Sequence, residues 1–200
     1  ISGYAGTINP EHELSVKRIV REATSCSVTC GHELSDMLDF KTRATTAILN
    51  ARIIGRIEKF LLQLKSTLAD YGIHAPIMVV KGDGTLMSEH MAAIKPVETV
   101  LSGPAASVAG ARYLTGLMDA VVVDVGGTTT DIAAVKKGIV RSHDSGTRVG
   151  RHRTHVKALD MRTVGLGGDS SINLSAGKLI IGPRRVGPVC WTASKDSGFK

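Results

Sequence analysis

The chain has 200 residues, which is enough for one sizeable domain or two small ones with a substantial core. Hydrophobic residues make up 42% of the sequence but aromatic residues only 4%, so we expect a core of Val, Ile, Leu and Ala. No apolar run reaches the length of a membrane span and no signal-peptide pattern is present, so we expect a cytoplasmic protein without a membrane partner. The net charge of +7 favours anionic partners, but basic and aromatic residues are not interleaved, which speaks against nucleic acid as a partner.

The first 75 residues predict a mainly helical segment. Asn9 and Pro10 provide a cap and a first turn for one helix. Apolar residues recur at helical spacing between Thr42 and Asp70, which predicts a long amphipathic helix that is expected to serve as scaffold. Gly72 suits the position just after the end of that helix.

The three cysteines, Cys26, Cys30 and Cys190, are few and odd in number, which fits a reducing compartment better than a disulfide scaffold. Cys26, Val28 and Cys30 alternate with polar residues, as in a short half-buried strand. Their spacing and the nearby His32 could suggest zinc. A structural zinc site needs four ligands, however, and no second pair follows, so packed free thiols are the favoured interpretation.

Residues 76–115 predict a strand, a glycine turn and two helices. The strand Ile77–Val80 runs into the turn 81–84, where Asp83 is either a binding-loop residue or a turn former. A short helix is expected over Ser88–Ile94. Ser102-Gly103-Pro104 then begins a helix of small residues, which could lie close against a sheet or another backbone.

Residues 120–135 predict a strand, a glycine turn and a second strand, and they read AVVVDVGGTTTDIAAV. Gly126 and Gly127 permit positive φ angles and a close approach of another group. Such a turn can aim several backbone N–H groups at one phosphate oxygen. The flanking carboxylates, Asp124 and Asp131, suit a hydrated Mg²⁺. An ordinary glycine hairpin is the alternative.

The remaining chain predicts a third strand of the meander, Ile139–Ser142, followed by two loops of interest. The basic loop 146–157 carries His152 and His155, which could share a metal, although a solvated or anion-facing loop is favoured because no acidic or cysteine partner lies beside them. The loop 165–171 is rich in glycine. It is either a second wall of a phosphate cleft or a multi-glycine bend before the next strand.

Four motifs occur in a fixed order along the chain: KGDGTLMS at 81–88, KPVETVLSGPAASVAGA at 95–111, VVDVGGTTTDIA at 122–133 and TVGLGGDSSI at 163–172. Together they resemble the hydantoinase A-type members of the hydantoinase/oxoprolinase family, within the actin, Hsp70 and hexokinase superfamily of ATPases. The resemblance covers almost the whole chain.

This resemblance implies an α/β, RNase H-like (actin-like ATPase) fold with a central mixed sheet and flanking helices, preceded by a helical segment. It places the helical segment at 1–75 and an incomplete ATPase lobe at 76–200. The implied activity is the ATP-dependent opening of five-membered cyclic amides such as hydantoin, N-methylhydantoin or 5-oxoproline. In the family's mechanism the amide carbonyl oxygen is phosphorylated and water then attacks the activated carbon.

The resemblance also assigns roles to residues. Asp124 and Asp131 are implied as catalytic residues and as holders of Mg²⁺. The residues implied to bind ATP are Gly126, Gly127, Thr128, Thr129, Gly167, Gly168 and Asp169. Asp83, His152 and His155 are candidates for the substrate side. The family leaves room for a hydantoinase B-type partner subunit beside the small cyclic amide substrate.

Two family features have no counterpart in this sequence: an earlier Asp-Gly-Gly-Thr hairpin and an adenosine-binding region. The chain also begins at Ile1, and we therefore expect a fragment that holds one wall of a nucleotide cleft, binds ATP weakly and has little or no turnover. A non-catalytic nucleotide switch like actin or Hsp70, and an acetone carboxylase-like subunit, are the alternative functions.

Overall fold

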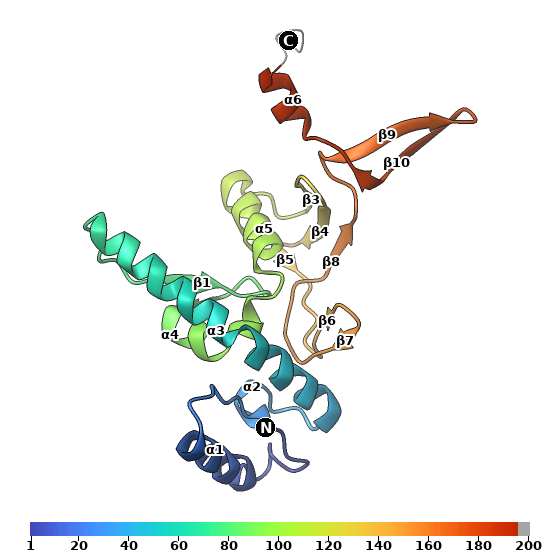
Figure 1. Cartoon of the computed structure of the whole chain (residues 1–200). Coiled ribbons are helices and arrows are strands. Elements are labelled where there is room, and N and C mark those ends of the chain that lie inside the picture. Colours follow the sequence, from blue (N-terminus) through green and yellow to red (C-terminus); the bar gives the residue numbers. More distant parts are fainter. Residues whose placement is uncertain (196–200) are drawn as a thin grey trace. The chain divides into compact units, whose positions relative to one another are not determined.

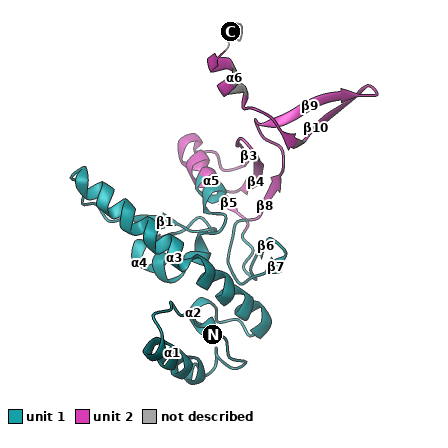
Figure 2. Cartoon of the chain, in the orientation of Figure 1, with its two compact units in different colours: residues 1–106, 142–159 teal, residues 107–141, 160–200 magenta. Residues whose placement is uncertain are grey.

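The computed structural model describes residues 1–195 and shows two compact units (Figure 2). Unit 1 comprises Ile1–Ala106 and Ser142–Leu159, and unit 2 comprises Ser107–Arg141 and Asp160–Lys200. The expected boundary after residue 75 falls inside unit 1, and that division of the chain stays a prediction. Among the described residues, no helix combines the length and apolar character needed to cross a bilayer.

Unit 1 begins with three helices, α1 (Glu11–Ala23), α2 (Gly31–Leu34) and α3 (Phe40–Asp70), of which α3 is by far the longest (Figure 1). The side chain of Asp39 caps α3 by accepting from the Thr42 N–H at 3.2 Å. At its end Gly72 has a φ of 68°, and the N–H groups of Gly72 and Ile73 donate to the carbonyls of Ala69 and Leu68 at 2.9 and 2.8 Å. This is a Schellman motif, which confirms the predicted end of the long helix.

A buried amide on α3 ties the helix to the rest of unit 1. The side chain of Asn50 is fully buried and donates to the Thr29 hydroxyl at 3.0 Å and to the Ile94 carbonyl at 2.9 Å. Its carbonyl oxygen accepts from the Val97 N–H at 3.0 Å. One side chain thus satisfies polar groups from three other segments, which confirms that α3 acts as scaffold.

The remainder of unit 1 consists of short elements. These are the antiparallel hairpin β1 (Met78–Val80) and β2 (Leu86–Ser88), the helices α4 (Glu89–Ile94) and η1 (Pro96–Thr99), and the pair β6 (Arg148–Val149) and β7 (His152–Arg153). Leu61 of α3 packs with Met87 and Ala92 in a small core.

The segment around the first two cysteines differs from the prediction. Residues 24–30 form no strand, because they have no neighbouring strand to pair with among the described residues. Cys30 instead caps α2, where its N–H donates to the Glu33 carboxylate at 3.0 Å. Cys26 is exposed whereas Cys30 is buried, so only Cys30 is a packed thiol. The side chain of Cys190 lies outside the described residues.

Unit 2 contains one four-stranded sheet and a separate hairpin. The sheet is formed by β3 (Ala120–Val125), β4 (Thr130–Lys136), β5 (Ile139–Val140) and β8 (Met161–Val164). The hairpin is formed by β9 (Ser170–Ser175) and β10 (Lys178–Arg185), followed by α6 (Val189–Lys195). The helix α5 (Ser102–Thr115) crosses the boundary between the units.

The α/β class and the strand-turn-strand meander are confirmed, but the expected mixed sheet is not found. Every strand pair in the described part of the sheet is antiparallel. Connection length accounts for two of these pairs, because short turns join β3 to β4 and β4 to β5, and a parallel pair would need a crossover of a dozen or more residues.

Candidate functional site

The hairpin β3–β4 places two carboxylates side by side. Asp124 and Asp131 are direct partners in the antiparallel register, so their side chains leave the same face of the sheet. Both residues are half-buried. Directly opposed like charges destabilise a strand pair, and a bound cation relieves that repulsion.

The two carboxylates differ in their partners. Asp131 accepts a short hydrogen bond from the hydroxyl of Thr163, its neighbour on β8. Asp124 has no hydrogen-bond or ion-pair partner in the described part of the chain. One carboxylate is thus held in place while the other remains available as an oxygen ligand. Asp131 was predicted from the sequence, but Thr163 was missed because only the pairing of β8 with β4 brings it there.

The turn between the strands carries free donors. The Gly126 N–H donates to the Thr129 carbonyl at 2.9 Å and closes the turn. Within residues 1–195, the N–H groups of Gly127, Thr128 and Thr129 donate to no protein acceptor. Gly127 and Thr128 are exposed and Thr129 is half-buried. Consecutive free N–H groups of this kind suit an anion, as the sequence predicted.

Gly126 and Gly127 do not adopt the positive φ angles that glycine permits, and the close approach of backbones instead requires glycine at position 167. A Cβ added to Gly167 would lie 2.6 Å from the carbonyl oxygens of Gly126 and Gly127. The Gly168 and Asp169 N–H groups donate to those same two carbonyls at 3.0 and 2.7 Å. The two glycine-rich segments therefore pack backbone against backbone.

This packing engages the polar groups of the second loop. The Gly167 N–H donates to the Ser170 hydroxyl at 2.9 Å, and the Asp169 carboxylate forms an ion pair with Arg185. The Thr130 hydroxyl donates to the Leu166 carbonyl at 2.7 Å. These contacts hold the loop against the β3–β4 turn, and its direct contact with a nucleotide stays a prediction. The sequence pattern gave no signal for Arg185, which the hairpin β9–β10 brings back to Asp169.

The three candidates for the substrate side belong to unit 1, whereas the hairpin belongs to unit 2. Asp83 accepts from the N–H and the hydroxyl of Thr85 at 2.9 and 2.6 Å and lies 3.4 Å from the Lys81 ammonium. Burial raises the pKa of Asp83, but the Thr85 hydrogen bonds and the charge of Lys81 outweigh it, so that its pKa lies below the ordinary value. These contacts are those of a turn former, and a substrate role for Asp83 stays a prediction.

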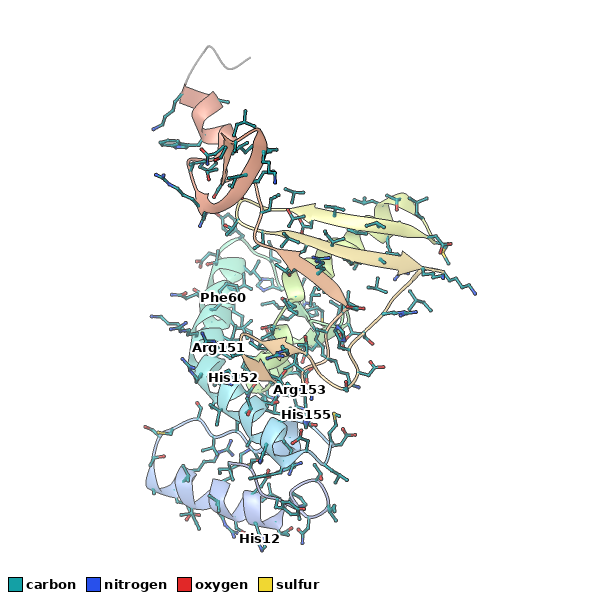
Figure 3. All side chains as sticks on the ribbon, turned by 90° about the vertical axis from the view of Figure 1, so that its right-hand side faces the viewer. His12, Phe60, Arg151, His152, Arg153 and His155 are labelled. Atoms are coloured by element: carbon teal, nitrogen blue, oxygen red, sulfur yellow. The ribbon has the colours of Figure 1, made fainter. Side chains whose placement is uncertain are left out.

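The two histidines of the basic loop differ in their surroundings. His152 is exposed on β7, and His155 is buried beside α3, where its backbone N–H donates to the Thr46 hydroxyl at 2.9 Å (Figure 3). Burial lowers the pKa of His155, and its Nδ1 atom forms no hydrogen bond with residues 1–195. They form no shared metal cluster in the described part of the chain.

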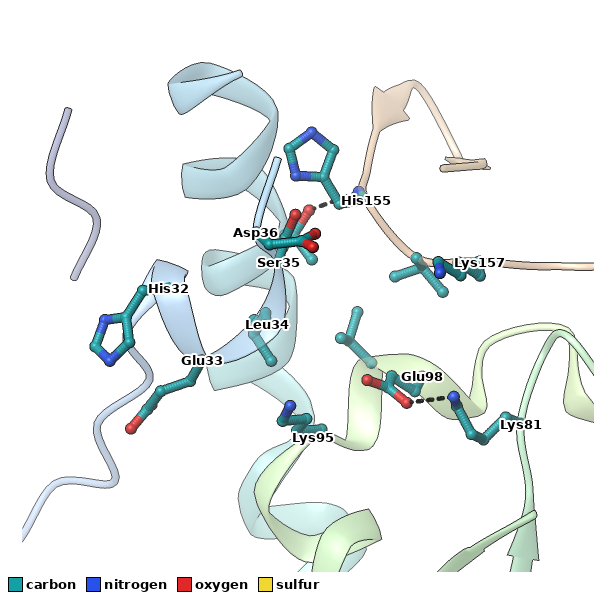
Figure 4. Close-up of a pocket in the computed structure, with 13 residues that line it drawn as sticks. His32, Glu33, Leu34, Ser35, Asp36, Lys81, Lys95, Glu98, His155 and Lys157 are labelled. Atoms are coloured by element: carbon teal, nitrogen blue, oxygen red, sulfur yellow. Dashed lines mark hydrogen bonds and ion pairs between the residues drawn. The ribbon is translucent and has the colours of Figure 1, made fainter. Parts of the chain in front are cut away.

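A cavity of about 310 Å³ lies within unit 1 (Figure 4). Carboxylates and lysine ammonium groups line it in equal number, and the Lys81 Nζ atom lies 3.0 Å from the Glu98 Oε2 atom. The charged residues that line it are Glu33, Asp36, Lys81, Lys95, Glu98 and Lys157. None of the hairpin residues lines this cavity.

The sequence model of the family described as Hydantoinase/oxoprolinase matches residues 43–200. The chain belongs to the hydantoinase/oxoprolinase family. It is 29% identical to the alpha chain of caprolactamase from Pseudomonas jessenii over 193 residues, covering 92% of this chain and 27% of that protein. It is 28% identical to 5-oxoprolinase 1 of Arabidopsis thaliana over 193 residues, covering 91% of this chain and 15% of that protein.

Two solved structures resemble this member of the hydantoinase/oxoprolinase family. The ATP-dependent caprolactamase from P. jessenii matches with a TM-score of 0.74 and 28% identity, covering 97% of this chain and 29% of that one. Nucleotide-free acetone carboxylase matches with a TM-score of 0.71 and 22% identity, covering 92% of this chain and 27% of that one. These matches confirm the α/β ATPase-type fold that the resemblance implies. The chain spans less than a third of the length of these relatives.

Proposed function

We propose that this chain carries a phosphate-binding and Mg²⁺-binding wall of an ATP-dependent cyclic amide hydrolase. The observation that carries the proposal is the β3–β4 turn, where three free N–H groups lie next to two opposed carboxylates. Phosphoryl transfer requires positioning and neutralisation of charge, and this turn offers donors for phosphate oxygens together with ligands for a cation.

The donor set of the hairpin fits Mg²⁺ and ATP. Mg²⁺ binds one or two carboxylates and keeps several waters, so Asp124 and Asp131 would hold it through their oxygens. The N–H groups of Gly127, Thr128 and Thr129 would bind the phosphate oxygens. Thr163 orients the Asp131 carboxylate, and the Gly165–Asp169 loop holds the turn through hydrogen bonds to the carbonyls of Gly126 and Gly127.

The substrate class rests on the family rather than on a contact in this chain. Its relatives include 5-oxoprolinases and a caprolactamase, whose names describe the opening of cyclic amides. ATP supplies a phosphoryl group that makes the amide carbonyl oxygen a better leaving group, and this chain's residues bind and orient the phosphates. We extend the proposal to a five-membered ring such as hydantoin, N-methylhydantoin or 5-oxoproline, and to a hydantoinase B-type partner subunit.

A carboxylase-type subunit is the second candidate, and one observation favours it. The chain is 27% identical to the acetophenone carboxylase gamma subunit of Aromatoleum aromaticum, covering 92% of this chain and 27% of that protein. Phosphate release by the protein, measured alone and with a hydantoinase B-type subunit, separates the two candidates. Stimulation by a cyclic amide supports the hydrolase, and stimulation only by a ketone with bicarbonate supports the carboxylase.

The hairpin itself is tested by the substitution Asp124→Asn. It removes the charge of the unpartnered carboxylate while keeping its shape, so we expect Mg-ATP binding measured by calorimetry to be abolished. Asp70→Asn, at the exposed end of α3, is the matched control and should leave binding unchanged. Equal binding by the Asp124→Asn chain and the unmodified chain would show that the hairpin is structural only.

A further inference from the structure

We propose that Glu13, Cys30 and His32 of unit 1 form a zinc-binding site separate from the phosphate hairpin. The three side chains come from α1, from the residue that caps α2 and from α2 itself. One ligand atom from each lies within 4.8 Å of the other two. Carboxylate oxygen, thiolate sulfur and imidazole nitrogen are the three ligand types that bind zinc in proteins.

The geometry is close to what a zinc ion requires. The His32 Nδ1 atom lies 2.6 Å from the Glu13 Oε2 atom. With bonds of about 2.0–2.3 Å, tetrahedral zinc ligands lie roughly 3.5 Å apart, so a small opening of this pair admits the ion. The Cys30 thiol donates to the Glu13 backbone carbonyl at 3.6 Å, and its sulfur lies within 4.8 Å of the ligand atoms of Glu13 and His32. Three protein ligands leave a fourth position for water, and the partly exposed His32 side chain gives water access.

Further contacts fix the backbone around the cluster. The Glu13 Oε1 atom accepts from the Gly3 N–H at 2.6 Å, and Oε2, which accepts from the His32 N–H at 3.0 Å, is the oxygen that lies against the His32 ring. The Cys30 N–H is held by Glu33, which also pairs with Lys17. Such outer contacts orient the ligands of a metal site. A Cβ at Gly6 would lie 2.2 Å from Glu13 Oε1, so the loop closes tightly over the carboxylate.

Two of the three proposed ligands are buried, which is unusual for side chains that can carry charge. Glu13 is 1% exposed and Cys30 is fully buried. Burial raises the pKa of the Cys30 thiol, and the charges of Glu33 and Glu13 raise it further. On binding zinc, the thiol and the Nδ1 atom of His32 release any protons they hold to solvent, and the divalent charge balances the thiolate and the carboxylate.

The competing explanation is a hydrogen-bonded network without a metal, in which Glu13 accepts from the backbone and the ring of His32. Cobalt(II) distinguishes the two, because thiolate-bound cobalt has a charge-transfer band in the near ultraviolet. The purified 200-residue chain is stripped with a chelator and titrated with Co²⁺. We expect a saturable band at one ion per chain that disappears when Zn²⁺ is added.

Matched variants identify the thiolate. A chain with Cys26→Ser and Cys190→Ser keeps Cys30 as its sole cysteine and should keep the band. Cys30→Ser should lose it, with a fall in metal affinity beyond the roughly 10- to 100-fold that loss of an outer contact costs. Absence of the band in the folded unmodified chain, or its loss when only Cys26 and Cys190 are replaced, would overturn the proposal. The sole-cysteine variant gives an answer even if Cys30→Ser does not fold.

Discussion

At the scale of single residues, the site depends on what each side chain contacts rather than on its type. Asp124 and Asp169 are both aspartates within two residues of a glycine pair, yet Asp169 is paired with Arg185 and Asp124 has no partner among the described residues. The sequence placed both in the nucleotide site. It could not distinguish them because Arg185 reaches Asp169 only through the hairpin β9–β10.

His155 carries a prediction about pH. Burial lowers the pKa of its imidazole below the ordinary 6.5, the charges of Arg43 and Arg153 act in the same direction, and Asp39 and Asp36 oppose them. The unfolded chain therefore binds this proton more tightly than the folded chain. This contribution to the free energy of unfolding is fully present above about pH 6.5 and is lost as the pH falls below it.

The test compares urea unfolding at about pH 7.5 and about pH 5.5. His155→Gln should lose less stability over this interval than the unmodified chain, because it removes one group that must be protonated on unfolding. His152→Gln replaces an exposed histidine of the same loop and should retain the full pH dependence. An identical pH dependence in the His155→Gln chain and the unmodified chain would contradict the prediction.

At the scale of elements, the β3–β4 turn and the Gly165–Asp169 loop form one packed unit because their backbones are in contact. The local patterns predicted each loop separately. Their contact could not be read from the sequence, since it depends on β8 pairing with β4 just before the second loop.

Gly167→Ala tests this contact. Its new Cβ would lie 2.6 Å from backbone atoms of Gly126 and Gly127, which cannot give way as a flexible side chain would. We expect a loss of about 1–3 kcal/mol in the free energy of unfolding, together with weaker Mg-ATP binding. Gly165→Ala is the control, because nothing lies within 4 Å of its added Cβ. Equal stability of the two variants in urea unfolding would show that the loops are not in close contact.

At the scale of the whole molecule, helix periodicity, caps and glycine turns were enough to predict most elements in order. Helices are specified locally, which is why α1, α3, α4 and α5 were found with small errors at their ends. Strand pairing joins distant residues, so the antiparallel sheet and the β9–β10 hairpin were only partly anticipated. The division after residue 75 stays a prediction, and the inclusion of residues 142–159 in unit 1 could not be read from the sequence because it depends on contacts between distant segments.

Length leads to a prediction about turnover. This chain covers 27% of the caprolactamase alpha chain and 15% of 5-oxoprolinase 1. We therefore expect the 200-residue chain alone to bind Mg-ATP weakly and to release little phosphate, with or without a cyclic amide. A coupled phosphate-release assay measures this, with Asp124→Asn as the background. Robust, Asp124-dependent turnover by the chain alone would show that one wall is sufficient for catalysis.

The contact between the two glycine loops also sets an order of events during folding. The β3–β4 hairpin joins neighbouring residues, and hairpins of this kind form in about 1–10 μs. The second loop closes on it later, since the bond from Thr130 to Leu166 spans 36 residues of chain. The N–H groups of the β3–β4 turn therefore exist before the backbone that supports them. A nascent chain would present the turn first and stiffen it only once β8 and the loop after it have been synthesised.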